Sequence, residues 1–453
     1  TIKLDGNYPV GTNNVALGDA AMSAVQAGAD SNTAVGRLAL TANTTADYNT
    51  AVGGNSLRAN TTGHTNSSFG QDAMRFNSTG ASNVAVGQQA LHNNTTASNN
   101  TAVGFQAGYY TTTANRLTAI GQFAGYGQAT GAENTYVGYG SGPNTVANAS
   151  GQYNTGLGTF ALYSNTTASN NTAVGYQAGY STTTDGENTA VGSQAFYSNT
   201  TGNRNVALGR EALYSNTTAD GNTAVGFEAA LNNTTAELNS ALGFNALRTN
   251  TTGGNNVALG ASALYSNTTA SNNTAVGWFT LYNNSTGTTN TAVGGGVAGS
   301  VLSTMENNTT GSNNSAFGIG ALGKNTTASN NTAVGYQAMY SNTTGGENVS
   351  VGREALANNT TGSQHAFFGY QAGQKNTTGN YNTFIGRRAG YSTTTGSDNT
   401  IVGNGAGSSH TTGSSNGFFG TGAGNAITTG SNNTILGRYN GNQGGLDIRT
   451  SSN

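Results

Sequence analysis

The sequence predicts an all-β protein, a β-solenoid (β-roll) of about 25 coils, in which each coil is one repeat of 17 residues. The first observation is a glycine at 25 positions from Gly18 to Gly437, where 21 of the 24 intervals are 17 residues. The second is an aliphatic residue or phenylalanine directly before that glycine. A short fixed period is typical of solenoids, whose repeats pack only against their neighbours. Representative structural glycines of the repeat are Gly18, Gly104, Gly175, Gly209, Gly260, Gly335 and Gly403.

The repeat itself favours short strands over helices. Its consensus reads Asn-Thr-Ala-Val-Gly-Tyr-Gln-Ala-Leu-Tyr-Ser-Asn-Thr-Thr-Gly-Ser-Asn. Gly, Asn and Thr recur throughout and are poor helix formers. At about 3.3 Å per residue, the perimeter of one coil is at most roughly 56 Å. We therefore expect a flattened coil of two short strands. Asn-Thr-Thr-Gly forms one turn, because Asn and Gly tolerate left-handed dihedral angles.

One repeat array makes up most of the chain. We expect a lead-in over residues 1–13, the array over residues 14–440 and the start of a C-terminal segment over residues 441–453. Two insertions interrupt the period, near residues 139–157 and 295–317. Insertions in solenoids emerge as loops on one face and often form binding sites. The second insertion is apolar enough to pack onto the array, since it contains Val301, Leu302 and Met305.

Composition argues against several classes of protein. Charged residues make up 7% of the chain and the formal net charge is −2, so a basic surface for nucleic acid is not expected. The chain has no cysteine for disulfides or a thiolate metal site. No apolar run approaches the roughly 20 residues of a membrane helix, so membrane insertion is not expected. Low charge with abundant Gly, Asn, Ser and Thr also fits disorder, but a disordered chain would not keep an aliphatic residue at a fixed phase.

The Thr-Ala-Val segment suggests how chains assemble. Alternation along a strand places its alanine on the face opposite to the threonine and valine. A solvated face would carry longer polar residues, so we interpret the alanine row as an inter-chain face of a parallel homotrimer. The alternative is that alanine is simply tolerated on a crowded coil. Larger residues take this position in the last five coils, which predicts a wider shared core and the most tightly held end. The proposed face includes Ala207, Ala224, Phe367, Phe384, Ile401, Phe418 and Ile435.

Two resemblances follow from these motifs. Residues 205–209, Asn-Val-Ala-Leu-Gly, resemble the N-S-V-A-I-G repeat of trimeric autotransporter adhesin heads, as do residues 14–18 and 256–260. That resemblance implies left-handed β-rolls with three chains side by side. The sequence of residues 154–294 and 318–386 is similar to long repeat arrays in tail-fibre proteins of tailed phages. The ending from Gly445 to Asn453 also resembles the segment that follows such arrays, which implies that the array leads into further β-structure.

Candidate catalytic and metal-binding residues are scarce. The four histidines, His64, His92, His365 and His410, fall at different phases of the repeat, so we expect solvated loop residues rather than a cluster. Four acidic residues share one phase but rarely stand on successive coils, so no calcium ladder is predicted; they are Glu133, Glu187, Glu347 and Asp398. Motifs of nucleophilic hydrolases, metalloproteases and phosphate loops are missing from the sequence. We expect no enzyme activity, no cofactor and no metal site.

Three repeated features each leave two interpretations open. Asn-Thr-Thr triplets match the glycosylation acceptor pattern, but turn residues that bond their own backbone are favoured. Their threonine pairs also raise a minor ice-binding alternative, because ice-binding solenoids display flat threonine arrays. Aromatic residues at one phase could stack sugars, although stacking on one another is favoured. These aromatic residues are Tyr163, Tyr180, Tyr197 and Tyr214, with Phe227 and Phe244 at a second phase.

The sequence therefore predicts a structural role. We expect the non-enzymatic shaft of a phage tail fibre in the virion, which presents a receptor-binding tip for host attachment. Its partners would be copies of itself, and a host-surface receptor or glycan through a tip that this sequence does not reveal. The alternative is a bacterial adhesin or extracellular filament subunit at the cell surface. A polysaccharide depolymerase is disfavoured, because a coil of 17 residues leaves little room for a catalytic groove.

Overall fold

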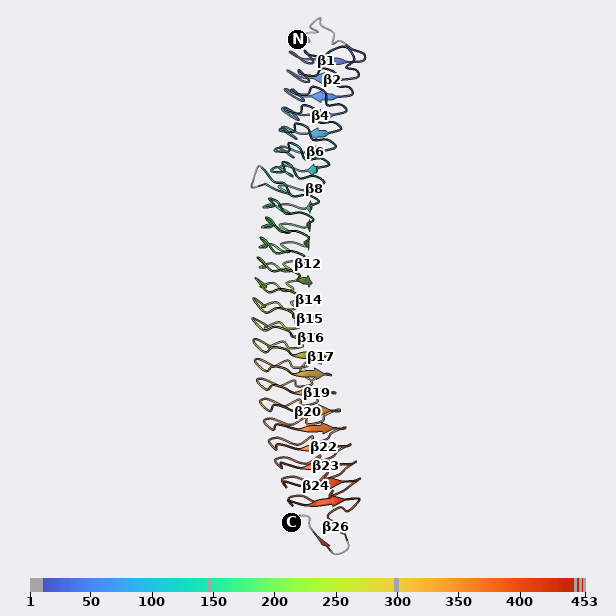
Figure 1. Cartoon of the computed structure of the whole chain (residues 1–453), viewed down its shortest axis with the longest axis vertical. Helices are drawn as coiled ribbons and strands as arrows, with labels where there is room; N and C mark the ends of the chain where they lie inside the picture. Colours follow the sequence, from blue (N-terminus) through green and yellow to red (C-terminus); the bar gives the residue numbers. More distant parts are fainter. Residues whose placement is uncertain (1–10, 145–147, 297–300, 444–445, 448–449, 451–453) are drawn as a thin grey trace. The chain divides into compact units, whose positions relative to one another are not determined.

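The computed structural model describes residues 11–144, 148–296, 301–443, 446–447 and 450. Most of the predicted lead-in and parts of both insertions and of the C-terminal segment lie outside these residues. The chain divides into two compact units, residues 1–222 and 223–453. Each unit is a stack of β-coils with one strand per coil, as Figure 1 shows. The all-β solenoid prediction is confirmed for each unit.

The strands that form the stacks are three residues long, and Thr-Ala-Val is their commonest sequence. In the first unit they are β1 (Val15–Leu17), β2 (Thr33–Val35), β3 (Thr50–Val52), β4 (Ser67–Phe69), β5 (Val84–Val86), β6 (Thr101–Val103), β7 (Thr118–Ile120), β8 (Thr135–Val137), β9 (Thr155–Leu157), β10 (Thr172–Val174), β11 (Thr189–Val191) and β12 (Val206–Leu208).

The second unit continues the same pattern and adds a short antiparallel pair. Its strands are β13 (Thr223–Val225), β14 (Ser240–Leu242), β15 (Val257–Leu259), β16 (Thr274–Val276), β17 (Thr291–Val293), β18 (Ser315–Phe317), β19 (Thr332–Val334), β20 (Val349–Val351), β21 (Ala366–Phe368), β22 (Thr383–Ile385), β23 (Thr400–Val402), β24 (Gly417–Phe419) and β25 (Thr434–Leu436). The pair is formed by β26 (Asn442–Gln443) and β27 (Leu446–Asp447).

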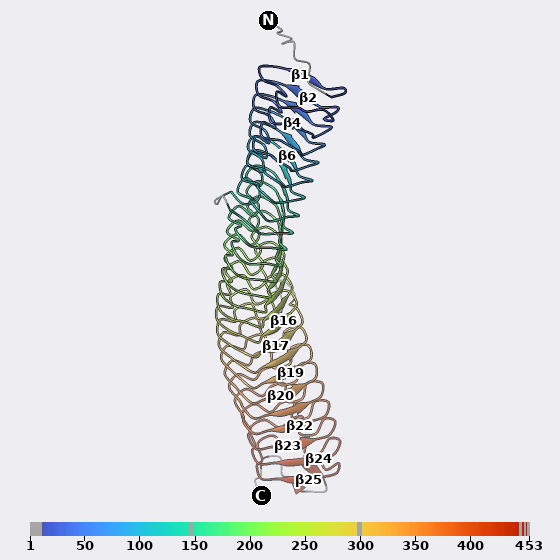
Figure 2. The ribbon, with the colours of Figure 1, turned by 45° about the horizontal axis from the view of Figure 1, so that its top comes forward.

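Within each unit, successive strands pair in parallel and in register (Figure 2). Thr172 pairs with Thr189 and Val174 with Val191, so identical positions of successive repeats lie side by side. The insertions do not break this register, since Thr135 pairs with Thr155 and Thr291 with Ser315. Met305 is fully buried at the core position that leucine holds in other coils, Val301 and Leu302 are partly exposed, and residues 145–147 and 297–300 lie outside the description.

The second strand predicted for each coil is wrong for the described coils. That side is a run of turns in which alternate residues take left-handed dihedral angles, such as Ser262 (φ 56°) and Leu264 (φ 52°). Its amides still bond along the stack: the N–H of Leu264 donates to the carbonyl of Thr280 at 3.0 Å. Leucine and glutamine rarely adopt positive φ, so propensity alone favoured a strand here.

The repeat glycine is required by geometry as well as by dihedral angle. Gly175 has a φ of 138°, and a Cβ atom built on it would lie 2.5 Å from the carbonyl oxygen of Gly192 in the next coil. A side chain at this position would therefore collide with backbone of the neighbouring coil. The seven glycines named from the sequence all have φ between 132° and 141°.

The interior of a coil is thin and combines small apolar residues with two asparagines. In the coil of residues 256–272, Ala258, Ala263 and Leu264 are buried, and so are Asn256 and Asn267. A buried amide must be hydrogen-bonded to be tolerated. In this coil, Asn256 and Asn267 both meet this demand through hydrogen bonds to the neighbouring coils.

The first asparagine column, which we call the strand ladder, precedes each strand. The backbone N–H of Asn256 donates to Oδ1 of Asn239 at 2.9 Å, and the Oδ1 of Asn256 accepts from the N–H of Asn273 at 3.0 Å. Its Nδ2 crosses the coil and donates to the carbonyl of Ala270 at 2.8 Å. The side chain thus ties one coil to both neighbours.

The second column, the triplet ladder, consists of the asparagines that begin the Asn-Thr-Thr triplets. Nδ2 of Asn267 donates to Oδ1 of Asn250 at 2.8 Å and to the carbonyl of Ala270 at 2.9 Å. Oδ1 of Asn267 accepts from Nδ2 of Asn284 at 3.1 Å. Because Ala270 accepts from both ladders, the two columns are joined inside the coil.

The structure corrects the proposed inter-chain face. The side chains of Ala207 and Ala224 are fully buried inside their own chain, and Phe367, Phe384, Ile401, Phe418 and Ile435 are at most 4% exposed. These residues point into the coil, so they cannot contact another chain. Alternation defines two faces of a strand but not which one is internal. Alanine suits the internal face because the opposite wall of the coil is very close.

The predicted wider core near the C-terminus is also replaced by a different arrangement. Where phenylalanine takes the alanine position, glycine takes the place of the leucine six residues later. A Cβ atom on Gly373 would lie 2.1 Å from the ring of Phe367, and one on Gly390 would lie 2.5 Å from the ring of Phe384. The ring fills the space that the glycine leaves, so core volume is exchanged within the coil.

This exchange predicts a compensating pair of substitutions. Phe367→Ala should destabilise the second unit by about 3–5 kcal/mol because it opens a cavity. Gly373→Leu alone should destabilise it by at least 1–3 kcal/mol through overpacking. The double variant restores the alanine and leucine of other coils and should recover most of the loss. Chemical denaturation of the four proteins tests this, and additive losses in the double variant would contradict the exchange.

Candidate binding surfaces

The strand face is the outward surface formed by the first and third residues of β1–β25. The third residue is aliphatic or phenylalanine in each of these strands and is only half-covered or exposed; Leu259, for example, is 44% exposed. The first residue is mostly Thr, Ser or Val. No charged residue occupies either position in β1–β25. In each unit the coils therefore align an uncharged, partly exposed apolar column.

Sequence reasoning overlooked this surface because it assigned the aliphatic side of the strand to the coil interior. One signal could have found it. A face that carries large apolar residues in every repeat and never a charged one has the composition of an interface core. The alanine face lacks the bulk for such an interface.

Aromatic side chains form a separate column on the turn side of the first unit. The rings of Tyr163, Tyr180, Tyr197 and Tyr214 stack with centroids 5.0–5.1 Å apart and interplanar angles of 4–9°. In the second unit, Phe227 stacks on Phe244 at 5.4 Å. Each ring covers the face of its neighbour, as the self-stacking interpretation expects. The faces between stacked rings are therefore occupied and cannot receive a sugar.

The Asn-Thr-Thr triplets are turns with buried asparagines. The acceptor amide of Asn267 lies inside the coil and forms hydrogen bonds, which favours the turn interpretation over glycosylation of the folded chain. The Oγ1 of Thr268 donates to the carbonyl of Ser285 at 3.2 Å, whereas Thr269 is exposed. Only one threonine of each pair is thus free to face solvent, so the pair does not form the double array of the ice-binding alternative.

Two polar hollows lie at the same phase of the repeat, one in each unit. The first, of about 230 Å³, surrounds Gly186 in the first unit. The second, of about 430 Å³, surrounds Gly346 in the second unit. Many other coils have serine or asparagine at this position, as Ser169 and Asn203 show beside Gly186. Both hollows are shallow and hold few groups that could position a reactant.

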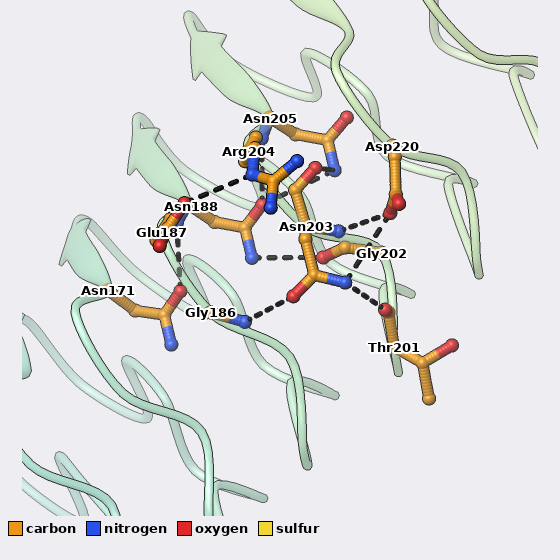
Figure 3. Close-up of polar contacts among 10 residues, drawn as sticks. All are labelled: Asn171, Gly186, Glu187, Asn188, Thr201, Gly202, Asn203, Arg204, Asn205 and Asp220. Carbon is orange, nitrogen blue, oxygen red and sulfur yellow. Dashed lines mark hydrogen bonds and ion pairs between the residues drawn. The ribbon is translucent and has the colours of Figure 1, made fainter.

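The walls of the first hollow are held by hydrogen bonds between coils. Figure 3 shows Arg204 reaching Glu187 of the preceding coil, where Nε donates to Oε2 at 3.1 Å. The N–H of Gly186 donates to Oδ1 of Asn203 at 2.9 Å, and the N–H of Asn203 donates to Oδ1 of Asp220 at 2.6 Å. At the second hollow, Gln364 donates to Glu347 at 3.0 Å. Glu187 and Glu347 therefore each accept a hydrogen bond from a side chain of the following coil.

The histidines are placed differently from the prediction of solvated loop residues. His64 is exposed, but His92, His365 and His410 are 7%, 2% and 0% exposed. Burial lowers the pKa of both His365 and His410 to about 4. Within the described residues, no three His, Cys, Asp or Glu side chains come close enough to hold a metal ion.

Asp185 is a buried carboxyl that repairs a gap in the triplet ladder. Its coil has Thr182 where most coils have the ladder asparagine. Asp185 Oδ2 accepts from Nδ2 of Asn199, the next ladder residue, and from Nδ2 of Asn188 at 2.8 Å. Desolvation raises the pKa of Asp185 to about 7 despite these hydrogen bonds. The carboxyl supplies the acceptor that the missing asparagine would provide.

No protein-family model matches the chain, and no curated protein matches it significantly. In the part of the chain that the structure describes, no helix is long and apolar enough to cross a membrane.

The raised pKa of Asp185 predicts that the first unit becomes less stable as the pH rises from about 4 to about 7. The folded chain holds this proton up to about pH 7, whereas the unfolded chain releases it near pH 4. Its contribution to folding is therefore present at low pH and decreases by about 3 kcal/mol between pH 5 and pH 8. Thr182→Asn with Asp185→Ala restores the usual ladder and should remove this dependence. Chemical denaturation of both proteins at pH 5 and pH 8 tests the prediction. A double variant that loses as much stability between these pH values as the natural protein would contradict it.

Proposed function

We propose that this chain is a shaft segment of an extracellular fibre in which three parallel copies pack through their strand faces. The observation that carries the proposal is the uncharged apolar column in each unit, on β1–β12 and on β13–β25. Single exposed valines are ordinary on a soluble protein. A column with one large apolar residue in every coil is a contiguous patch, and such patches mark interaction sites.

The spacing of the column indicates what covers it. Successive strands lie about 4.8 Å apart, so the column repeats one apolar side chain at that interval. A partner fills every row only if it has the same interval. A parallel copy of this chain has it by construction. Closed cyclic symmetry then brings identical faces to a common axis, and the resemblance to trimeric adhesin heads favours three copies.

The resemblance to phage arrays makes the proposal more specific. We infer that the fibre is a tail fibre of a tailed phage, that the chain acts without catalysis, and that a tip elsewhere in the fibre binds the host. Antibodies against this chain should then label the tails of phage particles. Labelling of the surface of uninfected bacteria would instead support the adhesin or filament alternative.

Charge on the strand face should separate the copies. Leu242→Glu with Leu259→Glu places carboxylates on adjacent outer positions of β14 and β15, where an interface would desolvate them. Light scattering after gel filtration should give three times the chain mass of 45.4 kDa for the natural protein and one chain mass for the variant.

A matched control separates loss of the interface from loss of the fold. Thr252→Glu with Thr269→Glu places the same two charges on exposed turn positions of the same coils. This control should keep the trimer mass and the circular dichroism of the natural protein. A natural protein that is monomeric at micromolar concentration, or a strand-face variant that stays trimeric, would refute the proposed interface.

A further inference from the structure

Two of the buried histidines occupy ladder positions of the second unit. His365 stands in the strand ladder, where other coils have asparagine. Its backbone N–H donates to Oδ1 of Asn348 at 3.0 Å, and its Nδ1 accepts from the N–H of Asn382 at 3.2 Å. The imidazole thus reproduces the acceptor of the asparagine that it replaces, but only while Nδ1 carries no proton.

His410 stands in the triplet ladder two coils later. Its Nδ1 lies 3.1 Å from Oγ1 of Thr393, and its Nε2 lies 3.2 Å from Nδ2 of Asn416. An amide nitrogen can only donate, so Nε2 must act as an acceptor in this contact. The ring bridges three coils at a point where Thr393, like Thr182 in the first unit, already interrupts the asparagine column.

The surroundings of both rings disfavour a positive charge. The ring of His365 lies 4.9 Å from that of Phe367, and the ring of His410 lies 5.9 Å from that of Phe418. The polar groups that face them are amides, a hydroxyl and backbone groups. Among the described residues, no acidic or basic side chain interacts electrostatically with either ring. A proton gained by either histidine would therefore be buried without a counter-charge.

We propose that the coils between Asn348 and Asn433 form an acid-sensitive segment, which opens in mildly acidic solution while the preceding coils of the second unit stay closed. Protonation of His365 at Nδ1 makes a ring N–H face the backbone N–H of Asn382, so two donors meet. Protonation of His410 at Nε2 likewise makes a ring N–H face the side-chain NH₂ group of Asn416. Because solenoid coils are stabilised mainly by their neighbours, such a fault can open one segment alone. Opening would expose the phenylalanine core of these coils.

The direction of the pH dependence follows from the burial of the two rings in their neutral form. Both histidines titrate near 6.5 in an unfolded chain and near 4 in the fold. Their contribution to stability is therefore complete above about pH 6.5 and is lost as the pH falls toward 4. At pH 4.5 each histidine should favour the open segment by about 70-fold relative to neutral solution.

Hydrogen exchange of the full chain at pH 7.5 and pH 4.5, corrected for intrinsic rates, tests this proposal. Protection of residues 348–433 should decrease at least tenfold more than protection of residues 239–330. Each of His365→Asn and His410→Asn restores the residue of other coils and should reduce that difference, and the double variant should abolish it. His64→Asn removes an exposed histidine and should change nothing.

Two results would overturn the proposal. The first is a double variant that loses protection in acid as the natural protein does. The second is a variant that has already lost protection at pH 7.5, because asparagine would then not substitute at these positions as the ladders require. A fluorescent dye that binds exposed apolar surface gives a second measurement. It should bind the natural protein at pH 4.5 but not the double variant.

Discussion

The structure of each unit depends on buried amide side chains that bond to their counterparts one coil away. Asn256 and Asn267 each use both ends of the amide, so a shift of one residue would leave several buried polar atoms unpaired. Such a fault costs more than a small alanine-rich core could offset. The ladders therefore fix the register of the coils, and the register fixes the 17-residue period. The close approach at the repeat glycine follows from the same spacing.

Departures from the consensus are compensated within the same coil or its neighbour. Asp185 supplies an acceptor beside Thr182, and glycine makes room for each phenylalanine, as Gly373 does for Phe367. Histidine replaces a ladder asparagine at His365 with the acceptor retained. Asp185 and His365 keep an acceptor for the ladders and the glycine–phenylalanine exchange keeps the core volume, but the two titratable residues change how their coils respond to protons. The contributions of Asp185 and His365 to stability consequently change with pH in opposite directions, because burial disfavours the deprotonated carboxyl and the protonated imidazole.

Much of this fold could be predicted from the sequence, because a period is visible without any knowledge of packing. The repeat glycines, the parallel stacking and the Asn-Thr-Thr turns all follow from it. The orientation of the strand does not, since Thr-Ala-Val reads equally well with Ala207 inside or outside. The left-handed Leu264 and the buried Asn267 were also beyond prediction. Both are imposed by neighbouring coils against the ordinary preferences of leucine and asparagine.

The interactions that hold successive coils together explain why each strand can present an apolar surface to the outside. In most soluble sheets the large apolar residues must face inward to supply stability. Here the amide ladders and the alanine and leucine core already hold successive coils together. The third residue of each strand therefore does not need to be buried inside its own chain. A large apolar residue at this position throughout β1–β25, never replaced by a charge, fits the strand-face interface that we propose. Because the strand face is not needed to stabilise a single chain, it is the surface on which assembly should be tested.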